Sequence, residues 1–294
     1  MKIIPQSSLT PLAGRRFWFA VLIAPSFLVL VTFLIIPFLG LARLSLLPGE
    51  RAFDAEGVSA IQYGKLFVDG YFLSVLAETF ALGAIVAVIC AVLGFPVGYS
   101  LARLPARARR WRLIAVVLPL TLSLVVVVFG WMVVLGRTGV LNNMLMGMGL
   151  IDRPLRMVFN HGSVVFVLVQ QFLPFMILSV MGVVSHVDTV LEEASANLGA
   201  NRLTTFRRVI LPIAAPGIVS GMLLVFILTI SAFITPRLIG GSRVQMIGAV
   251  IYEQIVVLLN WPAGAAMSII LLLITIILLV SARAVSAILT GGRT

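Results

Sequence analysis

The sequence predicts an all-α polytopic membrane protein in which six helices cross the bilayer. Of its 294 residues, 61% are hydrophobic and only 11% are charged, whereas soluble domains carry about 25% charged residues. The mean hydropathy is +1.17, and the charges fall in short clusters between long apolar runs. Each run is long enough for the roughly 20 residues that a spanning helix requires. Lipid is therefore the expected solvent for most of the chain.

The uncharged stretches set the bounds of the six predicted spans. Proline delays a helix start, so Pro212 and Pro216 are expected to shorten the fifth span, and Pro262 the sixth. The predicted spans are residues 17–42, 79–102, 113–136, 162–185, 213–236 and 263–282. The run at 17–42 exceeds the apolar core of about 7–15 residues of a cleaved signal peptide. It is interpreted as a retained span.

The positive charges predict the orientation of these spans. Five arginines between Arg103 and Arg112 flank the second and third spans, and basic residues next to spans favour the cytoplasmic side. Both termini are then cytoplasmic, with residues 1–16 as the N-terminus and 17–290 as the transmembrane domain. The outer connections are 43–78, 137–161 and 237–253. Orientation explains the net charge of +11 better than nucleic-acid binding does, so the expected partner is membrane lipid and not nucleic acid.

No reactive constellation is visible in the spans. The sequence has no Walker A pattern and no H-E-x-x-H pattern, and its only histidines are His161 and His186. ATP hydrolysis and metal catalysis by this chain would need such residues. The sequence therefore predicts no catalytic residue, no metal site and no cofactor in this chain, and a protein that is not an enzyme.

The cytoplasmic segment at 187–212, here called the coupling loop, is too polar to span and is patterned as two short helices. Thr189 and Glu192 have the spacing of a capping box. Gly199 stands where a helix end takes a left-handed residue, and Asn201 or Thr204 can cap the second helix. Geometry alone fits a docking element and an ordinary connector equally well.

The same segment resembles the EAA loop of the permease subunits of type I ABC importers. Glu193-Ala194-Ser195 is followed at the family's spacing by Gly199, Val209 and Leu211-Pro212. The resemblance implies that the loop forms a coupling helix in a groove of a separate ATPase. The implied coupling residues are Glu192, Glu193, Ala194, Gly199, Arg202, Leu211 and Pro212. Two roles are open for Arg202, namely pairing with the ATPase and anchoring the fifth span at lipid headgroups.

Further segments are similar to the spermidine/putrescine branch of that family, the PotB-like permeases. They are Gly139-Val-Leu-Asn-Asn143, Leu173-Pro-Phe-Met-Ile177, Phe233-Ile-Thr-Pro236 and Trp261-Pro-Ala-Gly-Ala-Ala266. The resemblance implies a permease in the bacterial inner membrane that forms half of a pore with a different, PotC-like chain. It also implies two ATPase subunits, which bind ATP and Mg, and an extracytoplasmic solute-binding protein.

The solute path is expected to use polar and aromatic residues, because the spans carry almost no charge. The candidates are Trp131, Gln171, Ser231, Phe233 and Arg237, with helix packing as the alternative role for each. A cation at Arg237 repels a diamine and favours a carboxylate. The predicted solute is a small polar nitrogenous compound, either a polyamine or an opine-, amino-acid- or phosphonate-like molecule.

The alternative function is an autonomous secondary transporter or channel. Such a carrier is expected to place ionisable residues within its spans and to show paired inverted repeats. Neither is visible in this sequence, and a docking loop would have no use in it.

Overall fold

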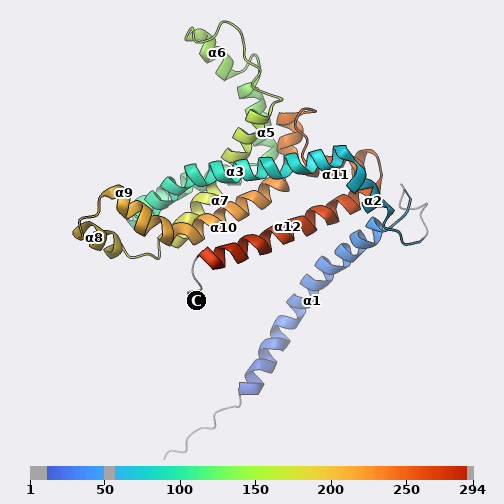
Figure 1. The fold of residues 1–294 in the computed structure, drawn as a ribbon, viewed down its shortest axis with the longest axis horizontal. Helices are drawn as coiled ribbons and strands as arrows, with labels where there is room; N and C mark the ends of the chain where they lie inside the picture. Colours follow the sequence, from blue (N-terminus) through green and yellow to red (C-terminus); the bar gives the residue numbers. More distant parts are fainter. Residues whose placement is uncertain (1–11, 50–56, 290–294) are drawn as a thin grey trace, which may run out of the picture.

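The structure, a computed structural model, describes residues 12–49 and 57–289 (Figure 1). In those ranges helices are the only regular secondary structure, and six are long and apolar enough to cross a membrane. The prediction of an all-α protein with six spans is confirmed. Residues 1–11 of the predicted cytoplasmic N-terminus lie outside the described ranges, and so do residues 50–56 of the predicted outer connection at 43–78 and the last residue of the predicted transmembrane domain.

Helices of three kinds build the chain. The long ones are α1 (Leu12–Ser45), α3 (Gly70–Ala102), α7 (His161–Val184), α10 (Leu211–Ile230) and α12 (Trp261–Leu289). A shorter apolar helix, α5 (Leu124–Leu135), continues through a bend into α6 (Val140–Gly147). The remaining helices connect these and are α2 (Ile61–Val68), α4 (Ala106–Val117), α8 (Val190–Asn197), α9 (Arg202–Thr205) and α11 (Ile247–Tyr252).

Three helices, α3, α7 and α10, lie side by side and form the core (Figure 1). Small residues allow them to approach closely. A Cβ atom on Gly98 would lie 2.8 Å from the Ile177 carbonyl oxygen, and one on Gly221 would clash with Met176 Sδ. Because α7 leads into α8 and α9 leads into α10, this packing fixes both ends of the coupling loop.

The second predicted span begins too late, at residue 79. Helix α3 starts at Gly70, where the Asp69 side chain accepts a hydrogen bond from the Tyr71 N–H (2.9 Å). Glu78, the charged residue directly before the predicted span, lies inside the helix and pairs with His161 Nε2 (2.7 Å). A charge paired with a neighbouring helix does not end a span.

The third predicted span, 113–136, is wrong as a single helix. Helix α4 ends at Val117, a 3-10 turn follows at Leu118–Thr121, and Leu122 and Ser123 are extended before α5 begins. Pro119 lies in this turn and cannot donate a backbone hydrogen bond. Twelve residues of α5 span about 18 Å, which is shorter than the hydrocarbon core of about 30 Å. The segment long enough to cross is Leu124–Gly147, which α5 and α6 form together with a bend between them. The crossing is therefore discontinuous.

The fifth predicted span, 213–236, is shifted. Helical structure runs unbroken from Arg202 to Ile230, so Pro212 and Pro216 do not delay its start. A π-helical turn at Phe206–Ile210, in which the Leu211 N–H donates to the Phe206 carbonyl, lies directly before Pro212. Such a wider turn accommodates the proline ring, which clashes with the preceding carbonyls of a regular α-helix.

The predicted outer connection at 237–253 is packed partly into the protein interior, although Arg237, Ser242 and Arg243 are exposed. Ile239, Met246 and Ile247 are completely buried, and Ile247 donates its N–H to Thr79 Oγ1 on α3 (2.8 Å). The segment folds as a π-helical turn at Pro236–Gly240 followed by α11. The apolar residues of this segment indicate burial, but span bounds that were set by charged residues did not use them.

Candidate functional site

The coupling loop folds as α8, a glycine turn and α9, at one end of the α3–α7–α10 bundle (Figure 1). Gly199 has φ +81°, the left-handed conformation predicted for it. Its N–H donates to the Ala196 carbonyl (2.9 Å), and the Ala200 N–H donates to the Ser195 carbonyl (3.2 Å). These two bonds form a Schellman motif that closes α8.

The second short helix is capped and tied to the first. Asn201 Oδ1 accepts a hydrogen bond from the Thr204 N–H (2.8 Å), as predicted for the start of α9. The hydroxyls of Ser195 and Thr205 lie 3.0 Å apart and form a hydrogen bond. Ser195 stands where the EAA pattern has alanine, so its hydroxyl adds a link between α8 and α9 that alanine could not make.

The capping box predicted at Thr189 and Glu192 is wrong. Thr189 has helical backbone angles and its side chain caps nothing, whereas an N-cap residue normally adopts extended angles. Asp188 Oδ1 instead accepts the Val190 N–H (3.0 Å). The Glu192 carboxylate is turned away from the helix start because it binds residues of α3.

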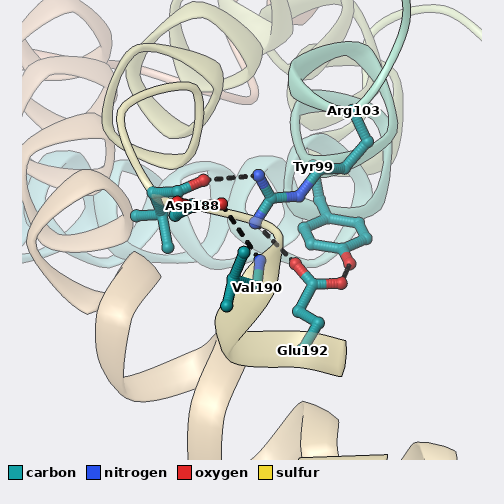
Figure 2. A network of polar contacts seen from close by, with 6 residues as sticks. Tyr99, Arg103, Asp188, Val190 and Glu192 are labelled. Carbon is teal, nitrogen blue, oxygen red and sulfur yellow. Dashed lines mark hydrogen bonds and ion pairs between the residues drawn. The ribbon is translucent and has the colours of Figure 1, made fainter. Parts of the chain in front are cut away.

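Glu192 pairs with the C-terminal end of α3, as Figure 2 shows. Its Oε1 accepts a hydrogen bond from Arg103 Nη2 at 2.5 Å, and its Oε2 accepts one from the Tyr99 hydroxyl at 2.6 Å. Arg103 Nη1 also donates to the Val187 carbonyl (2.7 Å). We call this set, Tyr99, Arg103 and Glu192, the α8–α3 clamp.

The clamp is shielded from solvent. The side chains of Arg103 and Glu192 are 19% and 24% exposed, and the Arg103 guanidinium lies 5.7 Å from the centre of the Tyr99 ring. Phe95, one turn before Tyr99, makes an edge contact with Phe206 (5.6 Å between ring centres). Charge-assisted bonds and aromatic packing therefore join both halves of the coupling loop to α3.

The opposite surface of the coupling loop faces outward. Glu193 and Ala194 are exposed although Glu192 beside them is not. Large apolar side chains are exposed here as well: Leu198 is 89% exposed, Leu203 63% and Val190 57%. Large apolar side chains that are exposed on a polar segment indicate an interaction surface.

The remaining predicted coupling residues flank this surface. Arg202 is exposed at the start of α9, and Leu211 and Pro212 are exposed where α10 begins. Within the described residues Arg202 forms no ion pair. The structure therefore places six of the predicted residues on the outer side of the loop or beside it, and Glu192 on its inner side.

The predicted solute-path residues separate into two clusters. In the first, Trp131 Nε1 donates to Gln170 Oε1 (3.1 Å), and Gln171 Oε1 accepts from Thr235 Oγ1 (3.0 Å). Both glutamines line a cavity of about 200 Å³ beside the break between α4 and α5. Discontinuous helices commonly border solute sites in transporters.

The second cluster follows the end of α10. Phe233 stacks on Tyr252 (5.5 Å between ring centres), and Arg237 lies over the same ring at 5.6 Å. Arg237 Nη1 is 3.7 Å from Glu253 Oε2. Ser231 caps the end of α10 and is exposed. Tyr252 and Glu253 were not among the predicted path residues.

Sequence reasoning missed Tyr99 and the role of Arg103. Their spacing of four residues was a usable signal, because such residues lie on one face of a helix. Their partner Glu192 lies 89 residues beyond Arg103, and no local pattern could reveal that pairing.

The chain is similar to permease subunits of transport systems. The family model described as "Binding-protein-dependent transport system inner membrane component" matches residues 94–290. The spermidine/putrescine transport system permease protein PotB of Haemophilus influenzae is 34% identical over 241 residues, which cover 82% of this chain and 84% of that protein. PotB of Escherichia coli is 34% identical over 83% of this chain and 89% of that protein.

Solved structures agree in fold. A chain of the bacterial alginate ABC transporter, in complex with an alginate pentasaccharide-bound periplasmic protein, aligns with a TM-score of 0.79 and 17% identity, covering 95% of this chain and 96% of that chain. A chain of the MetNI methionine ABC transporter aligns with a TM-score of 0.54 and 18% identity over 76% and 100% of the two chains. The protein therefore belongs to the binding-protein-dependent transport system inner membrane component family, and is a multi-pass permease subunit of an ABC importer in the bacterial inner membrane.

Proposed function

We propose that this chain forms half of a solute pore and receives the motion of a separate ATPase through the outward surface of the coupling loop. One observation carries this proposal: the neighbouring residues Glu192 and Glu193 face in different directions, because Glu192 binds α3 and Glu193 is exposed. A surface that docks a partner on one side and is bonded to a core helix on the other can pass displacement inward.

The exposed apolar residues favour docking over a connector role. Leu198, Leu203 and Val190 would lose much water-exposed surface against a groove. Burying one such side chain contributes about 1.5–3 kcal/mol. Arg202, exposed beside them, is in position to pair with acidic groups of the ATPase.

The implied assembly supplies what this chain lacks. Two ATPase subunits would bind ATP and Mg, because this sequence has no Walker A pattern. A second permease, a different and PotC-like chain, would complete the pore, and an extracytoplasmic solute-binding protein would deliver the solute. The orientation follows the arginines near residues 103–112, which favour the cytoplasmic side for the coupling loop.

The solute we propose is a polyamine, as the names of the PotB relatives suggest. Arg237 alone would repel such a cation, but Glu253 lies 3.7 Å from it and offsets its charge. The Phe233 ring, which is stacked on Tyr252 and is 37% exposed, then offers a face that attracts cations. An opine-, amino-acid- or phosphonate-like solute remains the second candidate, favoured by Arg237 itself.

Reconstitution tests this function. The complete complex, purified through a tag on this chain and placed in vesicles with its binding protein, should accumulate radiolabelled putrescine or spermidine only when ATP is present. Uptake by this chain alone under an ion gradient would contradict the proposal and support an autonomous carrier. ATP-dependent uptake of an acidic opine but of neither polyamine would replace the proposed solute.

A further inference from the structure

A cavity of about 600 Å³ opens at the far end of α7 from the coupling loop. Residues 156–159 line it directly before α7 begins, the end of α5 lines a second side, and residues 241–243 line a third. The 24 residues of α7 separate this cavity from α8 by about 36 Å.

Three arginines from three segments line the cavity: Arg137, Arg156 and Arg243. The lining contains no aspartate or glutamate. Within the residues that the structure describes, none of the three forms an ion pair, unlike Arg103 and Arg237. We call these three arginines and their cavity the cationic basin.

The basin is held in place by buried contacts. Asn142 on α6 is completely buried, donates to the carbonyls of Gly136 (2.9 Å) and Leu155 (3.1 Å), and accepts the Leu155 N–H (2.8 Å). These bonds hold Gly136 beside Leu155, and so place the next residues, Arg137 and Arg156, on the same cavity. Their proximity therefore does not depend on chance positions of free loops.

The third side is fixed through a strained residue. Phe159 has φ +63° and donates its N–H to the Ile239 carbonyl (2.8 Å). Gly241 has φ +60°, and a Cβ atom there would lie 2.8 Å from the Phe159 ring. A bulky residue keeps a positive φ only where its surroundings determine it. This contact joins the segment of Arg156 to that of Arg243.

Unbalanced like charges repel one another, so a fold that holds three of them together is suited to an anionic partner. The arginines are exposed on the protein surface. The PotB relatives are named for cations, and a cation would be repelled here unless a partner covered the basin. The family is named for its dependence on a binding protein, which must make contact outside the spans.

We propose that the cationic basin is a docking site for an acidic surface patch of the solute-binding protein. The inference rests on the proposed function, because it assigns a surface to one of the proposed partners. Electrostatic complementarity of this kind mainly raises the association rate and sets the register of the two partners.

The test uses the complete complex in nanodiscs and the solute-loaded binding protein that co-purifies with it. ATP hydrolysis is titrated against binding-protein concentration for wild type and for the triple variant Arg137→Glu, Arg156→Glu, Arg243→Glu. The half-saturating concentration should rise at least about tenfold in the variant, with the maximal rate and the basal hydrolysis unchanged. The matched control is Arg153→Glu, because Arg153 is exposed in the same loop but does not line the cavity.

Salt provides a second readout. Raising the ionic strength should weaken the stimulation of the wild type more than that of the triple variant, because screening acts on the charges that the variant no longer supplies. An unchanged half-saturating concentration in the triple variant would overturn the proposal.

Two other occupants have distinct signatures, and either would overturn the proposal. An anionic solute in the basin would change which solutes are taken up at saturating binding protein. A lipid headgroup there would make the effect of the variant vanish in nanodiscs of phosphatidylcholine alone. Failure of the wild type to show ATP-dependent uptake would instead reject the proposed function, whatever the variants do.

Discussion

Glu192 on α8 and Arg103 at the end of α3 form an ion pair whose side chains are 24% and 19% exposed, although 89 residues separate them in sequence. Tyr99 completes the clamp with a 2.6 Å hydrogen bond. Since α3 packs against both α7 and α10, a displacement of α8 reaches the core of the bundle directly. The clamp thus connects the coupling loop, where the ATPase is proposed to dock, to the helix bundle of this subunit.

Breaking the clamp should uncouple transport from ATP hydrolysis. In Arg103→Gln, Glu192 loses a charge-assisted bond of about 1.5–3 kcal/mol, so α8 can move without moving α3. We expect basal hydrolysis to persist and solute uptake per ATP to fall, measured on the complex in vesicles. Arg107→Gln, at an exposed arginine four residues away, is the control.

Exchanging the two charges of the ion pair distinguishes a coupling role of the clamp from a general loss of folding or stability. The double variant Arg103→Glu, Glu192→Arg restores an ion pair of reversed polarity and should regain part of the lost coupling. Equal uptake per ATP in wild type and Arg103→Gln would show that the clamp carries no motion.

Glycine should be required at position 199 because of its left-handed backbone conformation, and not because a side chain would lack room there. No atom lies within 4 Å of a Cβ built there, but a left-handed residue other than glycine costs about 1–2 kcal/mol. Gly199→Val should therefore reduce ATP-driven uptake, whereas Gly199→Asn should be close to wild type, because asparagine tolerates this conformation. Similar uptake by both variants would argue against the turn as the critical feature.

Leu198 should contribute to ATPase binding. At 89% exposure, its replacement by glutamate removes apolar surface from the proposed interface without disturbing the core. Burial of one leucine corresponds to about tenfold in affinity or more. We expect less ATPase to co-purify with Leu198→Glu, quantified by mass spectrometry, and wild-type amounts with Val58→Glu, a control at an exposed valine before α2 that is 82% exposed.

Charge at the Phe233–Arg237 cluster should tune solute preference. Glu253→Gln leaves Arg237 without its carboxylate partner, so uptake of spermidine should fall relative to that of an anionic solute such as glutamate. Arg237→Gln should shift the ratio the other way. Competition assays with both solutes measure the ratio of spermidine uptake to glutamate uptake. An unchanged ratio in both variants would show that this cluster is not part of the solute path.

The orientation can be tested with cysteine labelling. Cys90 is buried and is the only cysteine, so a Cys90→Ser background accepts single cysteines at new sites. In intact cells, a membrane-impermeant maleimide should label Ser242→Cys, in the cationic basin, and should leave Asn197→Cys, in α8, unlabelled. The opposite pattern would reverse the predicted topology.

Local patterns predicted much of this fold. Uncharged runs identified six spans, Gly199 was expected to be left-handed, and Asn201 was expected to cap α9, because each depends on neighbouring residues alone. The discontinuity between α4 and α5 was missed, since apolar composition does not distinguish a straight helix from one broken near Pro119. The π-helical turn before Pro212 shows the converse, a proline accommodated without ending the helix.

Long-range pairings account for the rest. Glu192 was assigned to a capping box because Thr189 stands three residues before it, and only the folded chain reveals that Arg103 and Tyr99 bind it. Similarly, Arg137, Arg156 and Arg243 lie far apart in sequence, and buried Asn142 and the Phe159–Gly241 contact bring their segments together.

The proposed function requires that a separate ATPase contacts the outward surface of α8. A photo-crosslinking amino acid at Asn197, which is exposed at the end of α8, measures this contact most directly in the intact membrane complex. We predict a crosslinked product that contains this chain and the ATPase subunit, identified by mass spectrometry. If illumination joins Asn197 to lipid or to no partner, in a complex that still transports solute with ATP, then α8 does not dock the ATPase.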